Sequence, residues 1–295
     1  MGIAYALLAM LCFATNIVIT RYALARLPVE SGFFVVLATN VVFPAALFAA
    51  ELGVRAAPYA WDWKGAGLFA IGGVIGTFLG RRFLFDAVRI LGPSRASVFH
   101  STAPAFALIA AWLLADEILG AYEIGLMAVV WVGLWLTQPR AGSRQFLSPE
   151  TLRKGLVVGL LTVAGFGFGN VLRGLAMRIW DEAALGTVVA SVAALICQFV
   201  VTRDWEKIGA QLRGAERKAI LLYTGCGVFT SLGSIFISLA MTRIEIALAV
   251  LVVHTTPLVI FPVSVFLLKN REELTPRTVL GASLVLAGIA FLAVR

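Results

Sequence analysis

The second half of this chain repeats the first half at a constant offset of 153 residues. Shifting the numbering by this offset places residues of the first half on identical residues of the second half. The matched pairs are Gly2 and Gly155, Leu7 and Leu160, Leu8 and Leu161, Phe13 and Phe166, Val18 and Val171, Ala23 and Ala176, Gly72 and Gly225, Gly80 and Gly233, Phe83 and Phe236, Ala87 and Ala240, Ala96 and Ala249, Thr102 and Thr255, and Pro104 and Pro257. A repeat of this kind indicates that one structural unit is built twice.

Both repeats are too apolar for soluble domains. The chain is 60% hydrophobic and only 14% charged, whereas about a quarter of the residues of a soluble domain are charged. Ten stretches contain no Lys, Arg, Asp or Glu, namely Met1–Thr20, Ser31–Ala50, Gly65–Gly80, Ala96–Ala115, Ile124–Pro139, Gly155–Leu172, Ala183–Thr202, Ala219–Thr242, Ile246–Leu268 and Thr278–Val294. Most approach or exceed the ~20 residues of a membrane-spanning helix. Because backbone amides find no water in lipid, we predict helices rather than strands.

Five stretches fall in each repeat, so the two repeats must cross the membrane in opposite directions. We therefore predict an all-α integral membrane protein with ten transmembrane helices in two inverted five-helix repeats. The first repeat covers residues 1–139, a connecting loop covers 140–154, and the second repeat covers 155–295. Inverted repeats place a substrate site near the midplane, where it opens to either side in turn. Helices 1, 3, 4, 6, 8 and 9 are expected around this central cavity.

Charge and motifs narrow the function further. The net charge of +8 comes from Lys and Arg near span ends, so membrane lipid rather than nucleic acid is the expected partner. Cys12, Cys197 and Cys226 are isolated and indicate neither a disulfide framework nor a metal site. No Walker A, dinucleotide-binding or HExxH motif occurs in the sequence. We therefore expect no cofactor, no metal and transport without ATP.

Basic residues are divided unevenly between the two sides of the membrane. With the stretches above, the side that holds the termini receives six Lys and Arg, and the opposite side receives the other eighteen of the 24. The positive-inside rule then places both termini outside the cytoplasm.

Regularly spaced glycines predict close contact between helices. Gly72, Gly76 and Gly80 form a GxxxGxxxG ridge, on which the backbone of a neighbouring helix can approach closely. The run from Gly165 to Gly169 reads GFGFG. This second pattern is compatible with a hinge or with a kink.

The run Ala96–Gly133 has a proline in the penultimate helix of its repeat, a Leu-Ala-Asp-Glu helix end and a last helix with spaced glycines. These residues are Pro104, Glu117, Gly125 and Gly133, and their counterparts are Pro257, Glu273, Gly281 and Gly288. The pattern resembles the EamA module of the drug/metabolite transporter superfamily. The second copy departs from it, since sixteen rather than thirteen residues separate proline and glutamate. The resemblance implies a transporter of amino acids, aromatic compounds, sugar phosphates or nucleotide sugars, with termini in the cytoplasm.

Several polar residues within the apolar stretches are candidate substrate contacts. His100 and His254 precede the matched prolines, and Thr102 and Thr255 accompany them. Imidazole groups could contact the substrate or allow proton coupling. Alternatively, each histidine bonds a backbone carbonyl freed by its proline. Asn16 and Asn170, in helices 1 and 6, could line the path or bridge helices.

Two adjacent arginines break the symmetry of the repeat, because Arg81 and Arg82 correspond to Ser234 and Ile235. Adjacent residues of a helix point about 100° apart, so one of the two is expected to face inward, and Arg82 is preferred. Arg173 in helix 6 is a further candidate of the same kind. Alternatively, Arg81 and Arg82 both reach the membrane interface.

The stretches contain no acidic residue, which favours a solute with a carboxylate or phosphate. Glu117 and Glu273 are interpreted as structural residues at helix ends. The sequence thus predicts a secondary or facilitative transporter of a small polar metabolite, an amino acid or organic anion, that works by alternating access in the cell membrane. Two alternatives are an intramembrane enzyme that acts on a lipid-linked phosphate and a membrane scaffold that transports nothing.

Overall fold

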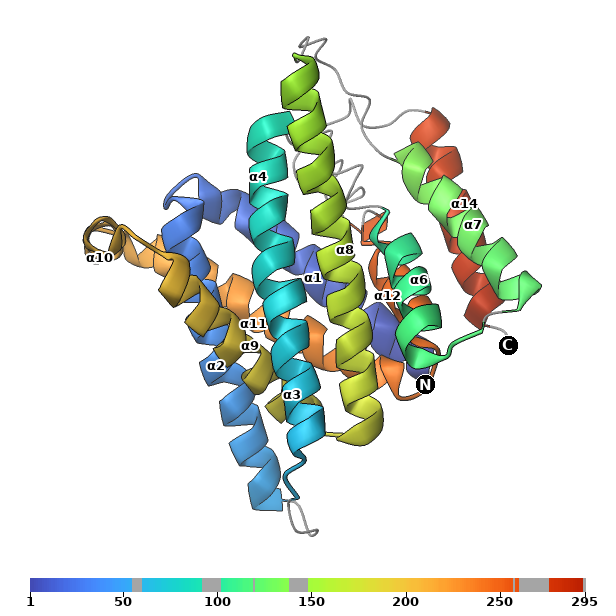
Figure 1. The fold of residues 1–295 in the computed structure, drawn as a ribbon, viewed down its shortest axis with the longest axis horizontal. Coiled ribbons are helices and arrows are strands. Elements are labelled where there is room, and N and C mark those ends of the chain that lie inside the picture. Colours follow the sequence, from blue (N-terminus) through green and yellow to red (C-terminus); the bar gives the residue numbers. More distant parts are fainter. Residues whose placement is uncertain are drawn as a thin grey trace.

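The computed structural model describes residues 1–54, 60–91, 102–118, 120–137, 148–256, 258–259 and 276–293, and within these ranges it contains helices and no strand (Figure 1). Six helical segments are long and apolar enough to cross a membrane: α1 (Gly2–Leu24), α2 (Val29–Val54), Trp63–Leu91, α8 (Pro149–Ile179), α9 (Ala183–Val201) and α11 (Arg217–Met241). The remaining helices are α6 (Ala103–Ala115), α7 (Ala121–Thr137), α10 (Trp205–Arg213), α12 (Ile246–Val253) and α14 (Pro276–Ala293). The protein is therefore an all-helical, multi-pass membrane protein.

The third spanning segment continues past the charges that flank the uncharged stretch 65–80, as expected for a stretch too short to span the membrane alone. It runs without interruption through α3 (Trp63–Gly72), the π-helix η1 (Gly73–Gly80) and α4 (Arg81–Leu91). Asp62 caps its start, because the carboxylate oxygen accepts a hydrogen bond from the Gly65 backbone N–H at 2.7 Å. Arginine is a good helix former, so two charges do not end the helix.

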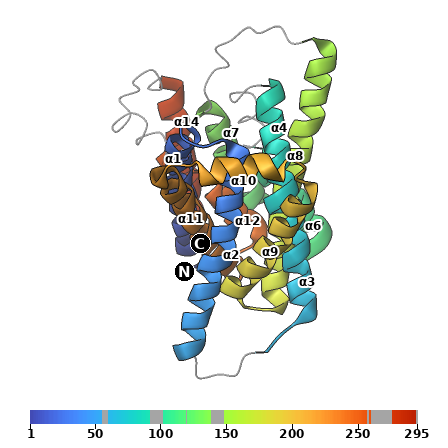
Figure 2. The ribbon, with the colours of Figure 1, turned by 90° about the vertical axis from the view of Figure 1, so that its left-hand side faces the viewer.

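One boundary differs from the sequence prediction. Helix α8 begins at Pro149, inside the segment 140–154 that is predicted to be a connecting loop. Ser148 sets this start, since its hydroxyl accepts a hydrogen bond from the Thr151 backbone N–H at 3.2 Å. The connection between α9 and α11 contains α10, which lies across α2 in Figure 2. Trp205 anchors α10, because its ring centroid lies 4.1 Å from that of Phe199 and 5.1 Å from that of Phe34.

The helices pack in two groups and one outlying pair. In the first group, α11 packs against α1 and α2, and α12 packs against α1. In the second group, α8 packs against α3, η1, α4 and α6, and α9 packs against α3 and η1. The groups meet where α2 packs against α9 and α12 packs against α6. Helices α7 and α14 form a separate pair at the right of Figure 1.

The start of α1 and the end of α14 both lie in the lower half of Figure 1, and we call this half of the molecule the terminal side. A Cβ added at Gly2 would lie 2.9 Å from Arg243 Cβ, just before α12. A Cβ added at Gly65, near the start of α3, would lie 2.4 Å from Trp180 Cβ, just after α8.

Glycines bring α8 into backbone contact with the third spanning segment. A Cβ added at Gly169 would lie 2.5 Å from Gly76 Cα, and one at Gly165 would lie 2.9 Å from Gly80 Cα. The close approach predicted for the Gly72, Gly76 and Gly80 ridge is therefore confirmed. The GFGFG run is part of the uninterrupted helix α8. In lipid, such close contact supplies the dispersion energy that holds helices together.

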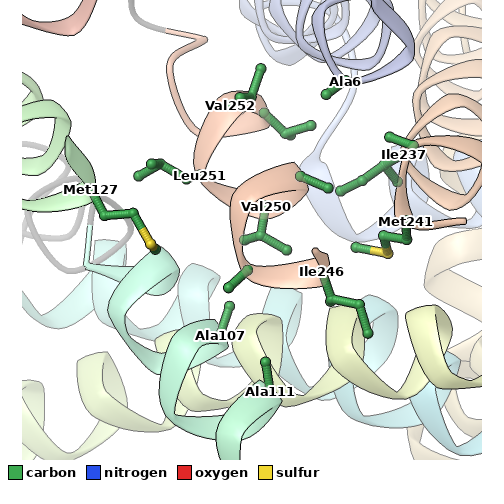
Figure 3. Close-up of a cluster of buried hydrophobic side chains, with 14 of the residues drawn as sticks. Ala6, Ala107, Ala111, Met127, Ile237, Met241, Ile246, Val250, Leu251 and Val252 are labelled. Atoms are coloured by element: carbon green, nitrogen blue, oxygen red, sulfur yellow. The ribbon is translucent and has the colours of Figure 1, made fainter. Parts of the chain in front are cut away.

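Helix α12 forms the centre of the largest apolar core (Figure 3). It contains no polar residue, and all but one of its eight side chains are buried. An all-round apolar helix is expected to be enclosed by other helices. In Figure 3, Ala6 of α1, Ala107 and Ala111 of α6, and Ile237 and Met241 of α11 surround it. The core therefore fills the space between α1, α6 and α11 near the terminal side.

The contact between α8 and η1 can be tested by adding one methyl group. Gly169→Ala should lower the free energy of unfolding by about 1–3 kcal/mol, because backbone atoms of Gly76 cannot move aside. This is measured as a lower Tm in detergent micelles. Gly67→Ala is the matched control, since a Cβ at position 67 meets no atom within 4 Å. Equal Tm values for the two variants would contradict the contact.

Candidate functional site

A polar cluster joins α1, α11 and α4 inside the helix assembly. The Thr20 hydroxyl lies 3.3 Å from Cys226 Sγ and 3.4 Å from Asn16 Oδ1. The Cys226 thiol donates to the Asn16 backbone carbonyl, with 3.9 Å between sulfur and oxygen. Arg81 lies close enough to Cys226 to interact with it electrostatically. We call Asn16, Thr20, Arg81 and Cys226 the polar cluster.

The cluster unites two candidates from the sequence with two residues that the sequence analysis missed. Asn16 and Arg81 are among the candidate substrate contacts that the sequence offers, whereas Thr20 and Cys226 are not. Thr20 occupies an informative position, because the 153-residue offset places it on Arg173. This correspondence between a hydroxyl and a guanidinium was the signal that could have identified Thr20. Cys226 gives no such signal, since a buried cysteine commonly behaves as a small apolar residue.

The structure corrects the preference between the two adjacent arginines. Arg81 is half-buried, and its Cζ lies 5.4 Å from the centroid of the Phe33 ring on α2, in a cation–π contact. Arg82 is exposed. The π-helix η1 lies directly before these residues and turns less per residue than an α-helix does.

Arg173 and Asn170 lie three residues apart on α8. Arg173 is buried, with 9% of its surface exposed, and Asn170 is half-buried. Residues with this spacing share one face of a helix. The structure thus places a cation and an amide on the same side of α8, within the second helix group.

The candidates near the prolines lie in different settings. Thr255 is fully buried, and its hydroxyl donates to the Val252 backbone carbonyl at 2.6 Å. This bond to a nearby carbonyl satisfies the hydroxyl within its own segment. His254 is half-buried at the end of α12, and Thr102 is half-buried just before α6. His100 lies outside the described residues, so the roles proposed for the two histidines stay predictions.

Glu117 connects three helices on the terminal side. Its carboxylate accepts hydrogen bonds from the backbone N–H groups of Ile246 at 2.9 Å and Ala247 at 3.3 Å, at the start of α12. It also forms a salt bridge with Arg178 of α8. Arg178 donates in addition to the Ala115 carbonyl of α6 at 3.2 Å. The carboxylate is well placed to neutralise the positive end of the α12 dipole.

Glu117 therefore not only stands at a helix end, as the sequence suggests, but also joins helices that lie far away in the chain. The sequence places Glu117 just beyond a helix end, and Asp116 before it adopts the left-handed conformation that turns the chain (φ 52°). The buried carboxylate then reaches a helix that starts 129 residues later. Its repeat counterpart, Glu273, lies outside the described residues.

A hollow of about 880 Å³ opens beside this network, and we call it the terminal vestibule. It is lined by ends of α1, α7, α8 and α11 and by the start of α12. Arg178, Asp181, Arg243 and Glu245 give its wall both signs of charge. Met177 and Met241 also line it, and both are nearly fully buried, so they form its floor.

The Glu117 network predicts an unequal effect of two similar substitutions. Glu117→Gln should lower the free energy of unfolding by about 1–3 kcal/mol, because Arg178 then loses its anionic partner. Glu150→Gln removes an exposed helical pair with Lys154, at 2.7 Å, and serves as the matched control. The control should change stability by no more than about 0.5 kcal/mol. Urea unfolding in micelles measures both, and a Glu117→Gln effect as small as the control would refute the network.

The sequence matches a known protein family, and the fold is similar to that of a known structure. The model of the EamA-like transporter family matches residues 1–138 and 153–294. Among curated proteins, none matches the chain. A protein of known crystal structure is similar in fold, with a TM-score of 0.72 and 18% sequence identity over 98% of this chain and 96% of the other. At this identity the likeness concerns the fold alone. The family model covers nearly the whole chain, and the protein therefore belongs to the EamA-like transporter family, within the drug/metabolite transporter superfamily.

Proposed function

We propose that this protein is a secondary or facilitative carrier that moves a small polar metabolite, an amino acid or organic anion, across the cell membrane. Membership in a family of membrane transporters supports the general activity. The mechanism and the solute class are inferred from how the two halves pack and from which charges lie inside them.

The observation that carries the proposal is that the helix contacts are symmetric under exchange of the two halves. The 153-residue offset exchanges α1 with α8, α2 with α9, the segment 63–91 with α11, and α7 with α14. The contact of α1 with α11 then becomes that of α8 with the segment 63–91, and the contact of α2 with α11 becomes that of α9 with the same segment. The α2–α9 and α7–α14 pairs map onto themselves. This pattern supports ten helices in two inverted repeats, 1–139 and 155–295.

The two helix groups are the parts that move in this mechanism. Each group contains helices from both halves, as expected when inverted repeats rock against each other around a site at mid-depth. The apolar core around α12 and the Glu117 network join the groups on the terminal side. We infer that this side is closed and that it must separate when the carrier opens there.

The charges of the interior support an anionic or carboxylate-bearing solute. Arg81 and Arg173 lie within spanning helices, whereas the carboxylates of the described residues lie at or near helix ends. A cation within a membrane protein attracts an anion strongly, because little water competes for it. This argument holds for either orientation of the protein in the membrane.

Reconstitution into proteoliposomes tests the proposed activity. Vesicles loaded with a mixture of amino acids or organic acids should take up the labelled form of the transported solute by counterflow, without chemical change. Empty liposomes are the control. Conversion of a lipid-linked phosphate would instead indicate an enzyme, and the absence of both flux and product would leave a scaffold.

A reversible cross-link between the groups tests alternating access. A Cβ at Gly174 of α8 would lie 2.6 Å from Cγ1 of Ile246 of α12, so cysteines at both positions lie within disulfide reach. The double variant Gly174→Cys, Ile246→Cys should lose at least about 90% of its counterflow on oxidation, because the terminal side can no longer open, and should regain it on reduction.

The wild-type protein exposed to the same oxidant is the control for its native cysteines. Full counterflow by the oxidised double variant, with the cross-link verified by mass spectrometry, would rule out opening between α8 and α12.

A further inference from the structure

We propose that Arg173 is the binding residue for an oxyanion, the carboxylate of the carried solute, at a site just below the floor of the terminal vestibule. This inference rests on the proposed carrier function and names the residue that selects the solute. Arg173 is only 9% exposed. Among the described residues, no side chain, backbone carbonyl or aromatic ring pairs with its guanidinium.

Three other arginines in the described helices have partners. Arg178 pairs with Glu117, Arg89 pairs with Glu30, and Arg81 lies over the Phe33 ring. These contacts explain why those three side chains are stable where they lie. Arg173 differs, because its five N–H donors are largely withdrawn from water and no group in the described part of the chain replaces it. Burial of an unpaired guanidinium opposes folding, and an uncharged side chain of similar length would be more stable at this position.

The location of Arg173 on α8 fits a site on the solute path. Met177 is one turn further along the same face and forms part of the vestibule floor. Asn170 is one turn in the opposite direction on that face and offers amide donors beside the guanidinium. A solute that passes the floor therefore reaches Arg173 within about one helical turn, roughly 5–6 Å.

The repeat gives a second, independent argument for the same position. Arg173 corresponds to Thr20 under the 153-residue offset. Thr20 belongs to the polar cluster and bonds Asn16 and Cys226. Equivalent positions of the two halves thus carry polar groups that face the interior. Thr20 presents a hydroxyl that is hydrogen-bonded, whereas Arg173 presents a guanidinium that pairs with no group among the described residues.

The planar fork of arginine specifies the chemistry of the ligand. It binds both oxygens of a carboxylate at once, or two oxygens of a phosphate, which an ammonium group cannot do with the same geometry. A cationic or uncharged solute would leave the guanidinium unpaired. The site therefore selects solutes that carry an oxyanion.

Stability measurements on three variants test the proposal in nanodiscs of phosphatidylcholine. Succinate and inorganic phosphate serve as oxyanion probes, and putrescine at equal ionic strength serves as the cationic control. Succinate or phosphate should raise the Tm of the wild-type protein, whereas putrescine should not. Arg173→Met should abolish this rise and should keep or increase the Tm without ligand. Arg173→Lys should retain part of the rise, and Arg153→Met, an exposed change on the same helix, should behave like wild type.

In proteoliposomes, Arg173→Met should raise the KM for the oxyanion solute by about tenfold or more, as expected from the loss of one charge-assisted contact. A lower ligand-free Tm in Arg173→Met, together with an intact response to succinate and phosphate, would show a structural role and overturn the proposal. So would a wild-type protein that responds to neither probe. Nanodiscs that also contain phosphatidylglycerol test the lipid as ligand: a rise in Tm only with this lipid, lost in Arg173→Met, would assign the guanidinium to a lipid headgroup and overturn the proposal. Each of these results leaves the carrier function intact if wild-type flux is observed, whereas absence of flux refutes the carrier function itself.

Discussion

The structure depends on two properties of the lipid around it. Lipid offers no hydrogen bonds to the backbone, and it provides no hydrophobic force that drives helices together. Helices solve the first problem because they pair their own amides. The second problem requires close packing, and here glycines provide it. Gly165 and Gly169 bring α8 against η1, while Gly167 on the other side of α8 faces Ala107 of α6. Helix α8 is thereby held from two sides and forms the centre of its group.

Because little water reaches the interior, each polar group there has a large effect on the stability of the fold. Glu117 satisfies the first amides of α12 and neutralises Arg178, so the start of an apolar helix is fixed to α6 and α8. Thr255 bonds within its own segment. Arg173 has neither arrangement. This contrast separates groups that stabilise the fold from a group whose partner must arrive from outside, and it connects packing with the proposed choice of solute.

Much of the fold could be predicted from the sequence, because the 153-residue repeat, the apolar stretches and the glycine ridge each reflect a local rule. The candidate site could be predicted only in part. Arg81 and Arg173 stood out as charges in apolar surroundings, but residue spacing does not reveal which of the adjacent Arg81 and Arg82 faces inward. The bond from Glu117 to Ile246 joins residues far apart in the chain, and no local pattern encodes it. Cys226 was overlooked because its hydrogen-bond partners, Thr20 and Asn16, come from α1, far away in the sequence.

The central claim is that two helix groups, each drawn from both halves, separate on the terminal side. Spin labels at Ile179 of α8 and Glu245 before α12, both exposed, report this separation in a transport-competent variant whose three native cysteines are replaced by serine. Pulsed electron paramagnetic resonance in nanodiscs should reveal two distance populations. One should match the present structure and one should be longer, and a transported solute should change their ratio. A single distance, unchanged by any solute that the protein carries, would contradict the account.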